Sequence, residues 1–311
     1  MMSERPKTSF FSPRRAIIIA QSTVTQLVRM KVFYFLAPIA LLFVGMQFFD
    51  VFWYEGPEAS QPQQELMMHK NLCLGTMMLF SSLFAIVSTA LLIPGDIEDR
   101  TLYTILCKPV PRLDYLVGKL LGVISVIFVA MLVMDLLMVV TLHYRTQTVS
   151  GELTEYLKAL GWGEEEIRED QENVAAHGPS VILQYGVLAH FFKACIIAAV
   201  ALLISTFSTS TLFTIATSVM IWIIGAVQSL ARDGLFTKGE FGAEPGMVDR
   251  ILGTIISLVF PDFQLFESAS DGAARAMEIA ASDMLHLGGL TLFYVAIYTV
   301  LSWFVFSDKE F

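Results

Sequence analysis

Six separate runs of mostly apolar residues, each about twenty residues long, constrain this chain of 311 residues more than any other feature. A helix needs roughly 20 apolar residues to cross the bilayer's hydrocarbon layer, which is about 30 Å thick. The runs cover residues 32–54, 72–94, 117–143, 187–205, 211–231 and 286–306. Only 16% of the residues are charged, against about a quarter in a soluble domain. We therefore predict an all-α integral membrane protein with six transmembrane helices, which excludes a soluble enzyme, a disulfide scaffold and a disordered chain.

The distribution of lysine and arginine predicts the orientation of these spans. Six crossings place both termini on one side, which holds ten Lys and Arg in 63 residues, whereas the other side holds eight in 114. The first side comprises residues 1–31, 95–116, 206–210 and 307–311, and the second comprises residues 55–71, 144–186 and 232–285. Because basic residues concentrate in cytoplasmic loops, we expect the N-terminal region and the tail 307–311 to be cytoplasmic.

The two long outer loops, 144–186 and 232–285, carry helical patterns of their own and predict a helical extracytoplasmic cap. Apolar spacing predicts a helix over 153–160, and an acid-rich stretch predicts another over 164–176. An alanine-rich stretch predicts a third from about Asp271. The apolar run 251–260 stops at Pro261, too short to cross, and favours an interfacial or re-entrant helix.

The stretch before the first run predicts a helix that lies in the membrane interface. Pro13 suits a first helical turn, and two basic residues follow it. One face can gather the apolar residues Ile17, Val24, Leu27 and Val28. Such an amphipathic basic helix lies on the membrane without crossing it. On these residues alone, a generic anchor and a specific role remain equally open.

The loop 95–116 predicts a short cytoplasmic helix. Acidic residues begin it, where the helix dipole favours them, and Pro109 and Pro111 end it. Between them, Leu102, Ile105 and Leu106 form an apolar stripe. A helix of this kind fits a groove on a partner protein, and it can also lie on lipid headgroups.

This loop resembles the first cytoplasmic loop of type-2 ABC transporter permeases. The residues that match the family's pattern in order are Glu98, Thr101, Leu102, Leu106, Pro109, Arg112, Tyr115, Gly118, Lys119 and Gly122. Arg100 stands where many members have glycine. The resemblance extends to the interfacial helix, the six-span layout, the cap and the C-terminal residues Phe306 to Phe311, and within the family it is nearest to the permeases of multicopper-enzyme maturation.

The resemblance implies a non-catalytic permease subunit in a bacterial cytoplasmic membrane, forming a homodimer that binds two copies of an ABC ATPase subunit. Leu102, Ile105 and Leu106 would bury the ATPase contact. The polar residues that would orient it are Glu98, Arg100, Thr101 and Arg112. Because the chain contains no GxxxxGK[ST] motif, ATP and magnesium would bind the partner, and this chain would need no cofactor.

Asp135 and Lys193 are ionisable residues that lie well inside predicted spans. Asp135 and Lys193 enter the membrane from the same side, at depths that allow them to meet. A charge at such depth costs about 2.5–3.5 kcal/mol, so each residue should face protein or water. We predict that they pair and tie the third span to the fourth; the alternative is that Asp135 lines a transport path.

Sulfur-containing residues raise copper binding as a further hypothesis. Met67, Met68, His69 and Cys73 lie together, and the third span carries Met131, Met134 and Met138. Copper favours thioether and thiolate ligands, but the same spacing suits a packing face, which we favour. No metal motif, nucleophile elbow, catalytic dyad or nucleic-acid patch is present in the sequence.

Three rival functions remain open at this stage. An ion- or proton-coupled secondary transporter would need more intramembrane ionisable groups and broken helices. An integral membrane enzyme would need clustered histidines or carboxylates near one interface. An assembly or scaffold protein would transmit ATPase work to an extracytoplasmic partner without moving a substrate.

Overall fold

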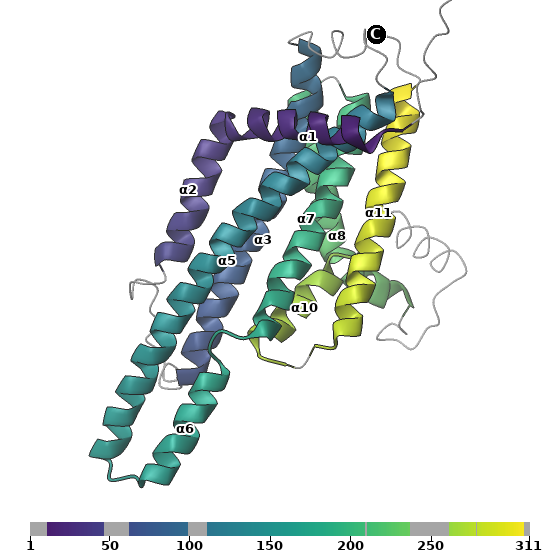
Figure 1. The fold of residues 1–311 in the computed structure, drawn as a ribbon. Coiled ribbons are helices and arrows are strands. Elements are labelled where there is room, and N and C mark those ends of the chain that lie inside the picture. The colour runs from purple at the N-terminus through teal and green to yellow at the C-terminus, as the bar shows by residue number, and fades with distance from the viewer. Residues whose placement is uncertain are drawn as a thin grey trace, which may run out of the picture.

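The computed structural model describes residues 11–46, 62–98, 111–208, 210–236, 261–277 and 279–307, and in these ranges the chain is helical and has no β-strand. Figure 1 shows the helices gathered into one elongated bundle. They are α1 (Pro13–Val28), α2 (Lys31–Gly45), α3 (Pro62–Glu98), α5 (Arg112–Ala159), α6 (Glu164–Ala176), α7 (Val181–Phe207), α8 (Thr211–Phe236), α10 (Gln264–Ala274) and α11 (Ala281–Ser307). The all-α prediction is confirmed.

Among the described residues, five helices are long and apolar enough to cross a membrane. They are α3, α5, α7, α8 and α11, each of which contains one of the predicted runs. The bent pair α1 and α2 makes a sixth candidate if it counts as one span, with an angle of 73° between its two parts. The chain is therefore a helical membrane protein with several crossings.

Helix α1 lies across one end of the bundle, hereafter the α1 end, and packs on the first turns of α5 (Figure 1). Two glycines of α5 permit this close crossing: a Cβ at Gly118 would lie 2.7 Å from Ile19 Cβ, and one at Gly122 would lie 2.6 Å from Thr23 Cβ. Small residues four apart let two helix backbones approach in this way.

The predicted apolar face of α1 is only partly buried against the bundle. Ala16, Thr23 and Leu27 are buried, whereas Ile17 and Val28 are exposed. The reason is that Ile19 and Thr23 of α1 lie against the two glycines of α5, so the close backbone approach selects the face that packs. Ile17 and Ile18 of α1 then remain exposed.

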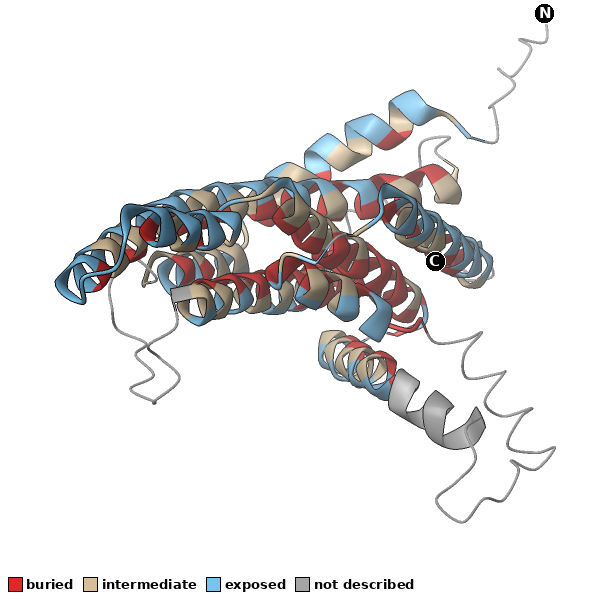
Figure 2. Ribbon diagram, turned by 90° about the horizontal axis from the view of Figure 1, so that it is seen from below, coloured by how far each residue is buried: buried red, intermediate tan, exposed pale blue. Residues whose placement is uncertain are grey.

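Helix α7 forms the centre of the bundle. It packs against α3, α5, α8, α10 and α11, and every residue from Lys193 to Leu202 is buried. Figure 2 shows the buried residues gathered along the middle of the bundle, with exposed faces on the surrounding helices. An apolar helix that is buried all round is typical of such a central position.

Helices α5 and α6 extend beyond the rest of the bundle as an antiparallel hairpin (Figure 1). The second predicted helix of this region is confirmed, because α6 has the expected bounds 164–176. The separate helix predicted over 153–160 is wrong, since α5 continues unbroken to Ala159. No proline interrupts α5 there, and Gly151 alone does not end it. Gly161, with φ of 81°, makes the turn.

Helix α10 begins earlier than predicted. It starts at Gln264, whose backbone N–H donates to Asp262 Oδ1 at 3.1 Å, and it ends at Ala274. The helix predicted from about Asp271 is therefore wrong. The left-handed conformation of Ala276, with φ of 54°, ends the helix before the alanine-rich stretch can continue it. The apolar run 251–260 lies outside the described residues.

Candidate functional site

Four side chains at the α1 end form a buried polar cluster, hereafter the loop-base network: Gln26 of α1, Asp96 of α3, and Tyr115 and Lys119 of α5. Lys119 Nζ lies 2.7 Å from Asp96 Oδ2, and Tyr115 Oη donates to the same oxygen at 2.6 Å. Gln26 accepts from Lys119 Nζ at 2.9 Å and donates to Asp96 at 3.4 Å. The network therefore joins the last turn of α3 and the first turns of α5 to α1.

A second ion pair holds the beginning of α1 against the beginning of α5. The Asp114 carboxylate, fully buried, accepts from Arg15 Nε at 2.7 Å and from the Ser12 backbone N–H at 3.1 Å. Asp114 lies in the first turn of α5 and binds the N-terminal end of α1. The N-terminal end of a helix favours a negative charge, so both helices stabilise this carboxylate.

Arg112, the first residue of α5, connects this end of the bundle to α11. Its Nη1 donates to the backbone carbonyls of Phe306 and Ser307, both at 2.6 Å. The Tyr115 ring stacks on the Phe306 ring at 5.9 Å between centroids. A guanidinium at a helix C-terminus satisfies carbonyls that have no partner within the helix.

The structure describes only part of the predicted ATPase contact. Arg100, Thr101, Leu102, Ile105 and Leu106 lie outside the described residues, and so does the side chain of Glu98. What the structure does place is the two ends of this loop. The loop begins after the last turn of α3, which contains Asp96, and it ends where α5 begins at Arg112. Both ends therefore adjoin the loop-base network.

A second buried cluster joins α7 to α10. Lys193 of α7, with 0% of its side chain exposed, donates to Glu267 Oε1 of α10 at 2.5 Å. The aromatic rings of Trp222 and Phe263 lie 5.9 and 5.5 Å from Lys193 Nζ. Ring faces stabilise a cation, so the ammonium has both an anionic partner and an aromatic lining.

The predicted pair between Asp135 and Lys193 is wrong, because each residue has a different partner. Asp135 Oδ1 accepts from Gln184 Nε2 at 3.0 Å, whereas Lys193 binds Glu267. Helix α10, which sequence reasoning placed too late in the chain, supplies the closer carboxylate. Glu267 and Ser270 are three residues apart in the sequence, so they share one face of α10.

The same face of α10 makes a second contact with α7. Ser270 Oγ lies 2.8 Å from His190 Nε2, and His190 is buried one helical turn before Lys193. Gly186 permits the close approach, since a Cβ there would lie 3.2 Å from Ala273 Cβ. On the other side, a Cβ at Gly225 of α8 would lie 2.5 Å from the Phe263 ring.

A third polar cluster, which sequence reasoning missed, lies at the opposite end of the bundle. Arg145 of α5 binds Glu65 of α3 at 2.8 Å and lies 3.3 Å from His69 Nε2. It joins α3 to α5 as the loop-base network does at the α1 end. No local pattern indicated it, because the two helices are 80 residues apart at this contact.

The sulfur-containing residues lie mostly in the packed interior. Met131, Met134 and Met138 are buried in the hydrophobic core, as is Cys73. Within the described ranges, no group of three or more His, Cys, Asp or Glu residues could hold a metal ion. The described residues therefore offer no such group of ligands in support of the copper hypothesis.

Comparison with models of known protein families and with curated proteins gave no match.

Proposed function

We propose that this chain is the membrane-spanning permease subunit of a type-2 ABC transporter, which couples ATP hydrolysis on a separate subunit to movement of a substrate. The observation that carries the proposal is the loop-base network. Five of the residues on which the family resemblance rests are Arg112, Tyr115, Gly118, Lys119 and Gly122, and each contacts α1, α3 or α11.

In the proposed topology, α2 is the first of six spans and α1 lies in the cytoplasmic interface. The α1 end then faces the cytoplasm of a bacterium, in agreement with the greater density of lysine and arginine in those segments. The hairpin of α5 and α6 belongs to the outer cap. Two copies of the chain would form a homodimer carrying two ATPase subunits.

The proposed mechanism is mechanical. An ATPase bound to the loop 99–110 would displace the end of α3 and the beginning of α5 together, because Asp96 and Lys119 join them through buried contacts. Gly118 and Gly122 would pass the displacement to α1, and Arg112 would pass it to α11. Packed helices move as rigid elements, so a displacement at this end reorients whole spans.

Affinity purification from the native host tests the ATPase contact. The wild-type chain should retain a nucleotide-binding subunit with a GxxxxGK[ST] motif, and Leu102→Asp combined with Leu106→Asp should release it. Leu160→Asp makes the same chemical change at an exposed residue on the opposite end of the bundle and should retain the subunit. An undiminished complex with the double variant would contradict the proposal.

An ion-coupled secondary transporter is the second candidate, and one observation favours it. The buried Lys193 and His190 and the partly exposed Glu267 form an ionisable cluster between α7 and the short helix α10, and intramembrane charges of this kind often mark ion pathways. Reconstitution decides between the two. An ABC permease requires the ATPase and ATP for transport, whereas a secondary transporter moves substrate in an imposed ion gradient with the purified chain alone.

A further inference from the structure

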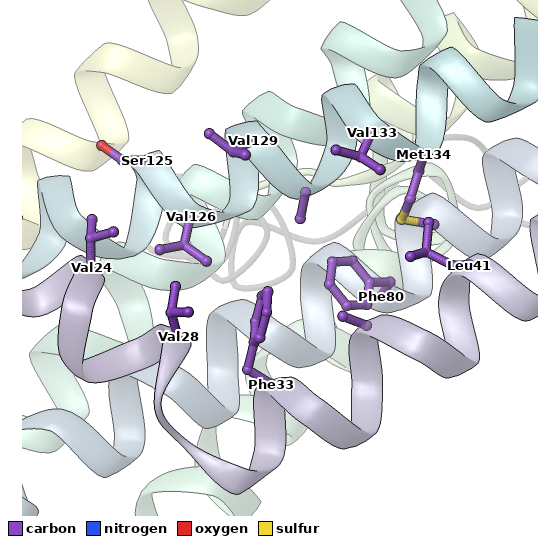
Figure 3. A pocket seen from close by; sticks show the side chains of 12 residues that line it. Val24, Val28, Phe33, Leu41, Phe80, Ser125, Val126, Val129, Val133 and Met134 are labelled. Atoms are coloured by element: carbon purple, nitrogen blue, oxygen red, sulfur yellow. The ribbon is translucent and has the colours of Figure 1, made fainter.

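An apolar hollow of about 260 Å³ lies between the α1–α2 elbow, α3 and α5. Figure 3 shows Val24 and Val28 of α1, Phe33 of α2, Phe80 of α3 and Val126 of α5 pointing into it. Ser125 also lines the hollow, but its hydroxyl donates to the Leu121 carbonyl at 2.7 Å. The lining is therefore almost entirely apolar and has few groups that could form a hydrogen bond with a ligand.

The hollow opens to the outside of the bundle. Val28, Val129 and Val133 line it and are 39%, 59% and 48% exposed. These residues belong to helices that lie on or in the membrane, so lipid chains surround the opening. An apolar cavity of about 150 Å³ in a soluble protein holds benzene, and the larger space here accommodates a segment of an acyl chain.

Positive charge lies at the elbow beside this hollow. Arg29 and Lys31 connect α1 to α2, directly between the lining residues Val28 and Phe33, and both are exposed. Neither forms an ion pair with any residue that the structure describes. The N-terminus of α2 adds to this charge, since no side chain caps it and its first turn holds no acidic residue.

We propose that the elbow binds one anionic phospholipid, with an acyl chain in the hollow and the phosphate against Arg29 and Lys31. The two halves of the site match the two halves of such a molecule: hydrocarbon between the helices, and two cations with the N-terminus of α2 at the headgroup level. Both halves adjoin the same six-residue stretch, Val28 to Phe33, so a single ligand can reach both. This site is independent of any ATPase contact.

Native mass spectrometry of the purified full-length chain tests the site, with phosphatidylglycerol and phosphatidylcholine of identical acyl chains as probes. The wild type should retain phosphatidylglycerol about tenfold more strongly. Arg29→Gln combined with Lys31→Gln should remove that preference and leave weak retention of both lipids. Arg14→Gln removes an exposed charge from the other end of α1 and should keep the preference.

Filling the hollow tests the acyl-chain half separately. Ala130→Phe on α5, or Ala37→Phe on α2, should lower retention of both lipids equally and leave their ratio unchanged. Gel filtration and circular dichroism establish that each variant is folded, and the two filling variants come from different helices so that one misfolded protein does not end the test.

Three outcomes would overturn the proposal. One is that Arg14→Gln lowers the preference for phosphatidylglycerol as much as the double variant at Arg29 and Lys31 does. The preference would then arise from the overall positive charge of α1 and not from a specific site. Another is unchanged lipid retention after both filling variants. The third is a change in the mass of the oligomer in place of a change in bound lipid, which would assign the hollow to a second copy of the chain.

Discussion

The Lys119 ammonium of α5 lies 2.7 Å from the Asp96 carboxylate of α3, and both side chains are more than nine-tenths buried. These residues stand on either side of the loop 99–110, so their contact closes the loop at its base. Tyr115 and Gln26 complete the hydrogen bonding of the pair. A buried pair of this kind is costly to break, because the remaining charge has no water to solvate it.

Asp96→Ala should lower the free energy of unfolding by about 3–5 kcal/mol, because it leaves the Lys119 charge buried without its partner. Adding Lys119→Met should restore part of that loss, since the double variant buries no charge at this position. Unfolding by SDS in mixed micelles measures both. The control is Arg168→Gln, which breaks an ion pair with Glu172 that is about three-quarters exposed, and it should change stability by less than about 1 kcal/mol. Equal stability of the single and double variants would contradict the pairing.

Gly118→Ala should destabilise the protein by about 1–3 kcal/mol, because the new methyl would meet Ile19 Cβ and the Ala16 carbonyl within 2.8 Å. Gly75→Ala is the matched control. Apart from the backbone of its own helix and its two chain neighbours, no atom of the described residues lies within 4 Å of a Cβ at Gly75, so alanine should be neutral or stabilising by up to about 1 kcal/mol there. The same unfolding measurement applies, and equal responses of the two glycines would exclude close packing of α1 on α5.

The two residues of the Lys193–Glu267 pair should respond unequally to removal. Glu267→Ala leaves a fully buried ammonium and should cost about 3–5 kcal/mol, whereas Lys193→Met leaves a carboxylate that is 33% exposed and should cost less. Thermal unfolding in detergent ranks the two variants. If Lys193→Met lowered the unfolding temperature more than Glu267→Ala did, Lys193 would stabilise the protein mainly through contacts other than the pair with Glu267.

Arg112→Gln should loosen the last turn of α11 without unfolding the bundle. The guanidinium is at the helix C-terminus, where a cation contributes about 1 kcal/mol, so amide hydrogen exchange at residues 303–307 should rise roughly fivefold. Arg14→Gln, an exposed arginine on α1, should leave exchange in α11 unchanged. If exchange at residues 303–307 were the same in Arg112→Gln as in Arg14→Gln, the capping role would be contradicted.

Much of the secondary structure follows from local patterns in the chain. The apolar runs predicted α3, α5, α7, α8 and α11, and the acid-rich segment predicted α6 with its observed bounds. Errors occurred where the signal was weak: α5 continued past the predicted boundary, and α10 began seven residues before Asp271. Helix ends depend on caps and contacts that a hydropathy pattern does not contain.

The candidate sites were less predictable than the helices. Sequence reasoning identified Arg112, Tyr115, Gly118, Lys119 and Gly122 as a group by resemblance, but not what each one touches. It also placed Lys193 inside the membrane and gave it the wrong partner. Depth along a helix can be counted from the sequence, whereas the direction in which a side chain points depends on how the helices pack.

The amino-acid sequence by itself determined that this chain is a helical membrane protein, because the need to bury backbone groups in hydrocarbon leaves long apolar helices as the solution for such runs. Only the tertiary structure decided that Asp96 meets Lys119, that Glu267 meets Lys193, and that α1 rests on Gly118 and Gly122. Tertiary contacts in this bundle join residues as far apart as Arg112 and Ser307, which are 195 residues apart in the sequence. Their geometry arises from the packing of whole helices, which no local stretch of sequence specifies.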